Sequence, residues 1–188
     1  ENLNQLRVPD GRERYVRDVF VPEFADDGTV QSVMAISVDL TELIEAQQAK
    51  HKSEEQLAAV MKNLTEGIII VDREGRFIYW NPAALAFHGY TGMDECLRKV
   101  TEFGDTFEAR PLCEDRLLRY EEWPIIRVLS GEVVHDFQHR MRRPDQGWEK
   151  VASYSGSLIH STDGEKLAFI SVTDITERKS AEDALWES

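Results

Sequence analysis

Residues 147–177 read GWEKVASYSGSLIHSTDGEKLAFISVTDITE, and this stretch decides the fold. Two runs of strand-forming residues flank Asp163-Gly164, which predicts two antiparallel strands joined by a tight turn. The stretch ends in Asp174-Ile175-Thr176-Glu177, a pattern typical of a helix start in which the aspartate caps and the glutamate reaches back. The sequence therefore predicts strand, turn, strand and helix in this order.

The same pattern occurs earlier, in residues 11–42, which read GRERYVRDVFVPEFADDGTVQSVMAISVDLTE. Gly11 and Gly147 are 136 positions apart, as are the two Asp-Gly turns. One extra residue in the first copy then brings Asp39 opposite Asp174. An internal repeat of this kind predicts two copies of one structural unit.

The order strand, Asp-Gly turn, strand and Asp-x-Thr-Glu helix start resembles the C-terminal (PAC) half of PAS domains, sensory modules common in bacterial signalling proteins. Residues 67–90, GIIIVDREGRFIYWNPAALAFHGY, resemble the start of the same fold, with a short helix opened by Asn81-Pro82. Residues 121–132, a helix start of sequence EEWP leading to SGE, are similar to PAS modules found ahead of sensor histidine kinases. The resemblance implies an α+β fold with a five-stranded antiparallel sheet and short helices on one face.

The resemblance divides the chain into four parts. Residues 1–41 are expected to be the last strands of an incomplete upstream module, 42–63 a helical linker, 64–177 a complete PAS domain and 178–188 the start of an output helix. The first part should contain strands near residues 2–7, 14–24 and 29–39. Its apolar face needs cover from a neighbour or a second chain, and consists of Val19, Val21, Val33, Met34 and Ile36.

Residues 40–64, LTELIEAQQAKHKSEEQLAAVMKNL, contain no Gly or Pro and predict a helix. Steps of four and three residues from Leu43 give a seam that is apolar at both ends and polar in the middle. The seam continues through Gln47, Lys50, Glu54, Leu57, Met61 and Leu64. A parallel coiled-coil homodimer and a monomeric linker lying on the sheet are the two interpretations, and either could cover the outward residues Leu167 and Phe169.

The composition fits a globular protein of 188 residues, 41% hydrophobic and 9% aromatic. Its net charge of −13 opposes attraction to nucleic acid or anionic lipid. The sequence has no apolar run of transmembrane length and no signal pattern, and Cys96 and Cys113 are too few for a disulfide framework. We therefore expect a cytoplasmic protein in which these residues contact neither nucleic acid nor membrane.

Metal and cofactor ligands find little support in the sequence. His135 and His139 fall on a predicted strand, where four residues span about 13 Å, too far for one ion without other ligands. His88 could ligate haem iron, as histidines in some PAS proteins do, but a structural histidine is the favoured interpretation. Light-sensing PAS proteins need a reactive cysteine within Asn-Cys-Arg-Phe, which is absent. The cofactor stays unknown, with haem and a flavin without adduct as the alternatives.

Catalytic patterns are also absent from the sequence, which has no phosphate-binding glycine loop, nucleophile elbow or His-Glu-x-x-His. His51 lies in AKHKSE, unlike the phospho-acceptor box of histidine kinases. We therefore expect a regulatory module rather than an enzyme.

A cavity between the sheet and the helices that begin near Asn81 and Glu121 is what the resemblance implies. A small-molecule ligand or cofactor in it would contact Trp80, Phe87, Phe103, Trp123, Ala152, Tyr154, Gly156, Ile170 and Val172. In the alternative interpretation the aromatic residues are plain core, and the small residues let neighbours pack closely.

Asp174 joins the last strand to the exit helix. The resemblance implies that it pairs with a polar or basic group on the neighbouring strand, for which Lys150 is the candidate, while Thr176 and Glu177 complete the helix start. Arg14 and Asp39 occupy the same positions in the first copy. Simple capping is the alternative.

Two functions remain open at this point. The first is a sensory input that binds a small molecule and biases the exit helix. The second is a ligand-free spacer and dimerisation module that relays signals from upstream domains. The expected partners are a second copy of the chain and an effector domain in the parent protein.

Overall fold

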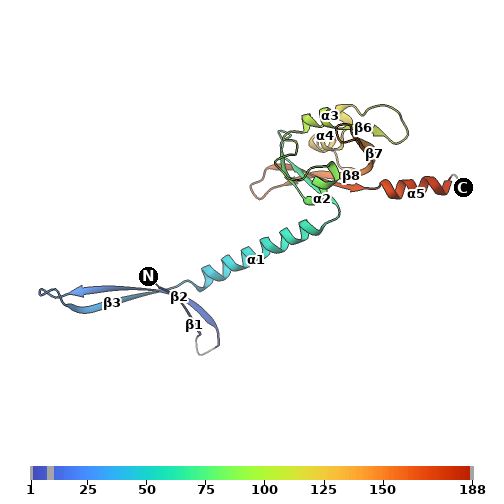
Figure 1. Ribbon diagram of the computed structural model, residues 1–188. Helices are drawn as coiled ribbons and strands as arrows, with labels where there is room; N and C mark the ends of the chain where they lie inside the picture. Colours follow the sequence, from blue (N-terminus) through green and yellow to red (C-terminus); the bar gives the residue numbers. More distant parts are fainter. Residues whose placement is uncertain (1, 8–10, 187–188) are drawn as a thin grey trace. The chain divides into compact units, whose positions relative to one another are not determined.

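The computed structural model describes residues 2–7 and 11–186, which form two compact units, Glu1–Ala59 and Val60–Ser188 (Figure 1). The boundary between the units falls within a helix. Residues 1 and 8–10 of the expected first part and residues 187–188 of the expected last part lie outside the described residues.

The first unit contains the three expected strands. Strands β1 (Asn2–Arg7), β2 (Glu13–Phe24) and β3 (Val30–Asp39) form an antiparallel sheet in the order β1-β2-β3. Val16 pairs with Asp39, and Gly28, with a φ of +81°, closes the turn between β2 and β3. In the second unit Ala152 pairs with Asp174. The repeat seen in the sequence is therefore also a repeat of strand register.

Helix α1 (Thr41–Asn63) follows β3 and confirms the helix predicted over residues 40–64. Strong helix formers fill its 23 residues, and none of its side chains is buried. Leu43, Leu57 and Val60 are all more than half exposed, at 63%, 59% and 58%. In the second unit Met61 and Leu64 are partly covered.

The second unit has an antiparallel sheet of six strands rather than the five expected. Their order is β5-β4-β9-β8-β7-β6, and they comprise β4 (Gly67–Val71), β5 (Phe77–Trp80), β6 (Glu108–Pro111), β7 (Val134–Arg143), β8 (Trp148–His160) and β9 (Lys166–Asp174). The unexpected strand is β6, in which Ala109 pairs with Met141 of β7. Both side chains are buried at 1% exposure, so the added strand seals that end of the core.

Short helices cover the core face of this sheet. They are α2 (Pro82–His88), the 3-10 helix η1 (Val100–Glu102), α3 (Phe103–Thr106), the 3-10 helix η2 (Tyr120–Glu122) and α4 (Pro124–Leu129). The last two replace the single helix that was expected to begin near Glu121. Trp123 is extended, with φ −64° and ψ 134°, because the ring of Pro124 excludes the residue before it from the helical region.

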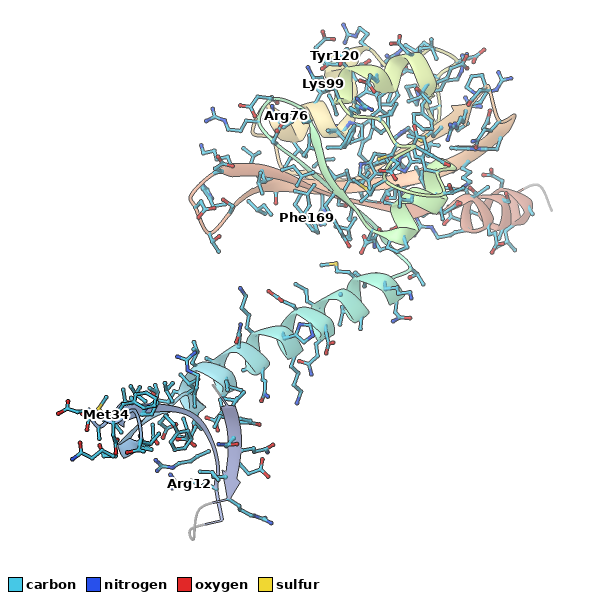
Figure 2. All side chains as sticks on the ribbon, turned by 60° about the vertical axis from the view of Figure 1, so that its left-hand side comes forward. Arg12, Met34, Arg76, Lys99, Tyr120 and Phe169 are labelled. Carbon is cyan, nitrogen blue, oxygen red and sulfur yellow. The ribbon has the colours of Figure 1, made fainter. Side chains whose placement is uncertain are left out.

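The core lies between α2, α4 and the central strands, where Ile69, Val71, Ala84, Val128 and Ile170 are fully buried. On β9, Ala168, Ile170 and Val172 face this core as predicted. Leu167 and Phe169 point to the opposite face and are partly covered. Figure 2 shows Phe169 on the side of the sheet away from Tyr120 and Lys99.

Helix α5 (Thr176–Trp186) leaves the sheet directly after β9. Among the helices that the structure describes, no stretch is both long enough and apolar enough to cross a membrane.

Candidate functional site

Helix α5 is attached to the sheet at its first turn by two residues, Asp174 and Thr176. One carboxylate oxygen of Asp174 accepts hydrogen bonds from the backbone N–H of Thr176, at 3.0 Å, and from its hydroxyl, at 2.6 Å. The Thr176 oxygen in turn accepts the backbone N–H of Val151 on β8, at 2.9 Å, while Ile175 donates its N–H to the Val151 carbonyl, at 2.9 Å. Strand β8 and the helix start therefore share two hydrogen bonds.

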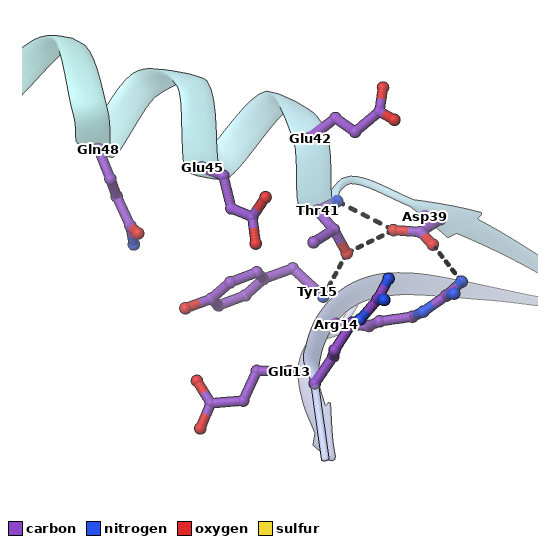
Figure 3. Close-up of a pocket in the computed structure, with 9 residues that line it drawn as sticks. Glu13, Arg14, Tyr15, Asp39, Thr41, Glu42, Glu45 and Gln48 are labelled. Atoms are coloured by element: carbon purple, nitrogen blue, oxygen red, sulfur yellow. Dashed lines mark hydrogen bonds and ion pairs between the residues drawn. The ribbon is translucent and has the colours of Figure 1, made fainter. Parts of the chain in front are cut away.

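The first copy contains the same arrangement at the start of α1. Asp39 accepts from the N–H and the hydroxyl of Thr41, at 3.0 and 2.6 Å, and the Thr41 oxygen accepts the N–H of Tyr15 at 3.0 Å (Figure 3). Leu40 donates its N–H to the Tyr15 carbonyl at 2.8 Å. We call each set, Asp39 with Thr41 and Asp174 with Thr176, an Asp-Thr latch.

The charged partner of the latch differs between the copies. Arg14 pairs with Asp39 at 3.0 Å, which confirms the prediction for the first copy (Figure 3). Among the described residues Lys150 makes no ion pair with Asp174, so that contact prediction is wrong. Lys150 instead donates to the Phe87 carbonyl at 2.8 Å and lies over the Phe87 and Trp148 rings. The end of α2 offers Lys150 both an acceptor and aromatic faces, which compete successfully with Asp174.

Among the described residues, Glu177 does not make the expected contact back to the start of the helix. Its side chain is exposed, and Thr176 holds the helix start to β8 in its place. The relay roles of Lys150, Asp174, Thr176 and Glu177 stay predictions.

A concavity of about 810 Å³ lies beside the first latch (Figure 3). Its lining carries both charge signs and consists of Arg12, Glu13, Arg14, Tyr15, Asp39, Thr41, Glu42, Glu45 and Gln48. Small-molecule sites are mostly apolar with a few polar groups, so this charged surface does not resemble one.

The residues predicted to line a ligand cavity lie together in the second unit, where they contact one another. Trp80 stacks on Phe103, with ring centroids 6.3 Å apart, and Phe103 meets Trp123 at 5.5 Å. The cavity beside Phe103 and Trp123 measures about 10 Å³, room for about one water molecule. Eight of the nine residues belong to the packed core, namely Trp80, Phe87, Phe103, Trp123, Ala152, Tyr154, Ile170 and Val172. Their role as ligand contacts stays a prediction.

Gly156 is the ninth residue, and its surroundings favour close packing. A Cβ atom at this position would lie 2.6 Å from the Phe169 carbonyl oxygen and 2.8 Å from Cδ1 of Ile170. Such distances are well below van der Waals contact. The missing side chain therefore lets β9 and α4 approach β8 rather than leaving room for a ligand.

Two buried histidines stand beside Tyr154 in the core. Nδ1 of His88 lies 2.8 Å from the Ala84 carbonyl, and Nε2 lies 2.9 Å from the Tyr154 hydroxyl. Because a carbonyl only accepts, Nδ1 of His88 carries the proton and Nε2 accepts from Tyr154. The His139 ring stacks on the Tyr154 ring, with centroids 5.1 Å apart, and neither of its nitrogens has a hydrogen-bond partner among the residues that the structure describes.

Burial determines the protonation of both rings. Burial lowers the pKa of His88 to about 3, and the nearby charges of Lys150 and Arg143 act in the same direction. Burial also lowers the pKa of His139 to about 4. Both side chains are therefore neutral at neutral pH.

Asn81 connects the end of α1 to the core, a role beyond the helix cap predicted from the sequence. Its carbonyl oxygen accepts from the N–H groups of Ile68 and Ala84, at 2.8 and 2.9 Å. Its amide nitrogen donates to the carbonyls of Glu66 and Met61, at 2.9 and 3.4 Å. One fully buried side chain therefore joins the last turn of α1, β4 and α2.

The opposite end of α2 is held by two cations. Arg143 donates to the carbonyls of His88 and Gly89, at 2.7 and 3.0 Å, and Lys150 donates to Phe87. Cations at this end also match the helix dipole. Arg143 was not predicted, because its acceptors lie 54 and 55 positions away along the chain.

These contacts form a continuous path through the second unit. The path runs from the Met61 carbonyl of α1 to Asn81, along α2 to the Phe87 carbonyl, and across to Lys150 on β8. The residue next to Lys150 is Val151, which holds the latch of α5. The entry and exit helices of this unit are thus joined through α2 and β8.

No described group of three or more His, Cys, Asp or Glu side chains is arranged to hold a metal ion. Cys96 is buried and Cys113 exposed, and both are free thiols.

Comparison with known proteins identifies relatives of the second unit. A family model described as a PAS domain matches residues 55–124. The PAS domain of an HTR-like protein from Haloarcula marismortui is 20% identical, covers 70% of this chain and 98% of its own, and superposes with a TM-score of 0.51. At that identity the match shows the fold alone.

Two further solved structures are more distant. The PAS domain of nitrogen regulation protein NR(II) from Vibrio parahaemolyticus is 16% identical, covers 63% of this chain and 96% of its own, and has a TM-score of 0.47. A domain of a sensory box sensor histidine kinase/response regulator from Geobacter sulfurreducens is 19% identical, covers 65% and 94%, and has a TM-score of 0.44. No curated protein matches the sequence.

Proposed function

Since this chain carries a domain of the PAS family, we propose that residues 64–177 form a regulatory module that relays a signal from α1 to α5. In the parent protein α5 would lead towards an effector domain, such as the kinase of a bacterial two-component system. The module itself performs no catalysis in this scheme.

The bonded path between the two helices is the observation that carries the proposal. A shift of the last turn of α1 alters the acceptor at Met61, and Asn81 shares that displacement with β4 and α2. Lys150 couples the far end of α2 to β8, and the adjacent Val151 bears the latch of α5. The hydrogen bonds in this path belong to buried or partly buried groups, whose hydrogen bonds are electrostatically stronger than they would be in water.

The repeated latch supports the same function. Helix α1 leaves the first sheet through the same hydrogen bonds by which α5 leaves the second. Each helix is thus built as the exit element of the sheet before it. In this scheme α1 is both the output of the first unit and the input of the PAS module.

Hydrogen exchange tests the relay in the chain itself. Lys150→Met keeps the aliphatic stem but removes the bond to the Phe87 carbonyl, so amide exchange in α5 should accelerate severalfold. Lys166→Met is the matched control, since Lys166 is exposed on the neighbouring strand β9. If exchange in α5 stayed at the wild-type rate in Lys150→Met, the coupling through α2 would be refuted.

A second candidate function is small-molecule sensing in the same core, and His139 is the observation that favours it. A buried imidazole with two unpartnered nitrogens costs about 1–3 kcal/mol, and a polar ligand would remove that cost. The cavity beside Phe103 and Trp123 is only about 10 Å³, so any ligand larger than water would have to displace core side chains.

Two measurements separate the functions. Visible absorption detects haem or flavin in the purified chain, and native mass spectrometry detects an uncoloured ligand. A bound molecule that is lost on replacing His139 with Phe would establish sensing. A chain of 21.6 kDa without adducts from several expression hosts would leave the relay as the function.

A further inference from the structure

Three arginines gather on one face of the sheet in the second unit, on the edge strand β6 and its neighbour β7. Arg110 pairs directly with Arg140 across the two strands, and Arg142 is the next residue of β7 on the same face. The residues that alternate with them, Ala109 and Met141, are buried in the core, so the arginines lie on the outer face. Like charges directly opposite each other destabilise a pair of strands, so this arrangement needs a compensating group.

The nearby carboxylates satisfy only one of the three guanidinium groups. Arg110 donates to Asp115 at 3.0 Å. An oxygen of Glu108 lies 3.6 Å from a nitrogen of Arg110 and 3.9 Å from a nitrogen of Arg142, too far for a hydrogen bond to either. The Arg142 guanidinium therefore has a charged neighbour but no hydrogen-bond partner among the described residues.

Arg140 lies in the middle of the group, and its guanidinium makes no ion pair with a described residue. Its Nε atom is buried and has no hydrogen-bond acceptor within reach. Its cross-strand neighbours are Arg110 and the apolar Val151, and Gln138 beside it on β7 donates to Asp136. A buried donor without an acceptor destabilises a fold. The surroundings of Arg140 thus leave room for an anion to stabilise it.

We propose that these three residues form a binding site for a phosphate group, with Arg140 at its centre. We call Arg110, Arg140 and Arg142 the arginine site. A guanidinium group donates two parallel hydrogen bonds to phosphate, which fixes its orientation. The Cα atoms of neighbours across and along the strands are about 5 and 7 Å apart, distances that flexible arginine side chains span to reach one phosphate.

The surrounding carboxylates favour a phosphate over a carboxylate ligand. Glu108 and Asp115 already compete for the outer arginines, and Glu149 lies opposite Arg142 on β8. A phosphate monoester carries a charge of about −1.5 to −2 and three acceptor oxygens, one for each arginine. The net charge of −13 opposes a polyanion such as nucleic acid. The ligand is therefore free phosphate or a small molecule that carries a phosphate group.

The arginine site adjoins the start of the exit helix α5. Val151, which pairs with Arg140, is the residue whose backbone bonds to Thr176 and Ile175. The site is therefore one strand away from the latch of α5. An effect of phosphate on α5 rests on the proposed relay, whereas binding of phosphate does not.

Isothermal titration calorimetry of the full chain with inorganic phosphate, at constant ionic strength, tests the site. Arg140→Gln removes the charge and the fork of donors and should weaken binding at least tenfold. Arg98→Gln is the matched control and should bind as the wild type does. Arg98 is exposed, and its carbonyl accepts the N–H of Phe77 on β5, the strand at the opposite end of the sheet.

Thermal unfolding separates a loss of binding from a loss of fold. Without phosphate, Arg140→Gln should melt at or above the wild-type temperature, because it removes a charge that lies opposite Arg110. With phosphate, the wild type should melt at a higher temperature than without it, and Arg140→Gln should not.

The proposal would be overturned by a wild-type chain that binds no phosphate at millimolar concentration, or by equal binding in Arg140→Gln. Equal weakening in Arg98→Gln would also overturn it, since the attraction would then be nonspecific. Succinate, a dicarboxylate of similar charge, should bind more weakly than phosphate, and equal binding would contradict the preference for phosphate. Glycerol phosphate distinguishes the two sources, because tighter binding of the ester than of inorganic phosphate identifies a phosphorylated small molecule.

Discussion

His88 and His139 occupy the same core but differ in what their ring nitrogens contact. Both nitrogens of His88 are bonded, to Ala84 and Tyr154, whereas those of His139 have no well-formed hydrogen bond among the described residues, the backbone of Phe137 being a polar neighbour. A bonded buried polar group stabilises a fold, and an unbonded one destabilises it. The two histidines should therefore respond oppositely to the same substitution.

Replacing each histidine with Phe tests this at pH 7.5. His88→Phe removes the hydrogen bonds of the ring to the Tyr154 hydroxyl and the Ala84 carbonyl, leaving the hydroxyl only the weak contact with Sδ of Met141 at 3.8 Å, and should lower the free energy of unfolding by about 1–3 kcal/mol. His139→Phe retains the stacking on Tyr154 and removes two unpaired nitrogens, so stability should be unchanged or higher. Urea denaturation measures both; a large loss in His139→Phe would mean that the ring has a partner.

The lowered pKa values of about 3 for His88 and about 4 for His139 predict acid sensitivity. In the unfolded chain both rings take up a proton near pH 6.5, whereas in the folded chain they do so only below about pH 4. The unfolded state therefore binds more protons between these values, and stability falls as the pH decreases from 6.5 to 4.

Denaturant titration at several pH values measures that fall. Each buried histidine contributes a slope of up to about 1.4 kcal/mol per pH unit. His139→Phe should reduce the slope of the unfolding free energy against pH by the contribution of one proton. The carboxylates contribute equally to both proteins. Curves of equal slope would show that His139 is protonated, or accessible to water, in the folded state.

At the scale of elements, the helix starts are the points where sheet and helix must move together. Asp174 caps α5 and holds the Thr176 hydroxyl, which in turn holds Val151. The carboxylate thus orients a side chain that bonds to β8. Losing it affects both the helix and its attachment to the sheet.

Asp174→Ala should destabilise the PAS module by about 1 kcal/mol, the usual value of a helix cap. Asp174→Asn is the matched control, because asparagine caps as well as aspartate does. In a longer protein that carries the effector domain, the alanine variant should flatten the output while the asparagine variant retains it. Equal signalling by the two variants would reduce Asp174 to an ordinary cap.

The approach of β9 and α4 to β8 depends on Gly156. Gly156→Ala would place a Cβ atom 2.6 Å from the Phe169 carbonyl, so the strands must separate, at a cost of about 1–3 kcal/mol. Gly104→Ala in α3 is the control, since no atom lies within 4 Å and alanine favours helix. Thermal unfolding of both variants checks the contrast, which would fail if Gly156→Ala melted at the wild-type temperature.

At the scale of the whole molecule, local pattern predicted most elements and missed the contacts between distant ones. The strand pattern that recurs in the repeat, the Asp-Gly turns and the helix without glycine were each read from neighbouring residues. The strands, α1 and the PAS fold confirm these predictions. Strand β6 was missed because its four residues form a strand only beside β7. The helix expected near Glu121 is broken because Pro124 acts on Trp123, an effect that the sequence already contained.

The candidate site shows the same division. The Asp174 cap was predicted because its acceptor and donor lie two positions apart. The bond from Lys150 to Phe87 spans 63 positions, and the bond from Asn81 to Met61 spans 20. Such pairings are decided by how α2 lies on the sheet. The family resemblance therefore suggested the wrong partner for Lys150.

The two Asp-Thr latches also bear on how a chain of this kind can gain or lose modules. Asp39 and Asp174 are 135 positions apart, and each is followed by an aliphatic residue, Thr and Glu. The segment between them, residues 40–174, therefore begins and ends at equivalent positions of an Asp-Thr latch. Deleting residues 40–174 would leave Asp39 followed by Ile175-Thr176-Glu177, which is an intact latch sequence. Duplicating residues 40–174 would create a third latch sequence. A module of this kind can therefore be inserted or deleted as a whole, in evolution or by protein engineering, without changing the sequence at either latch.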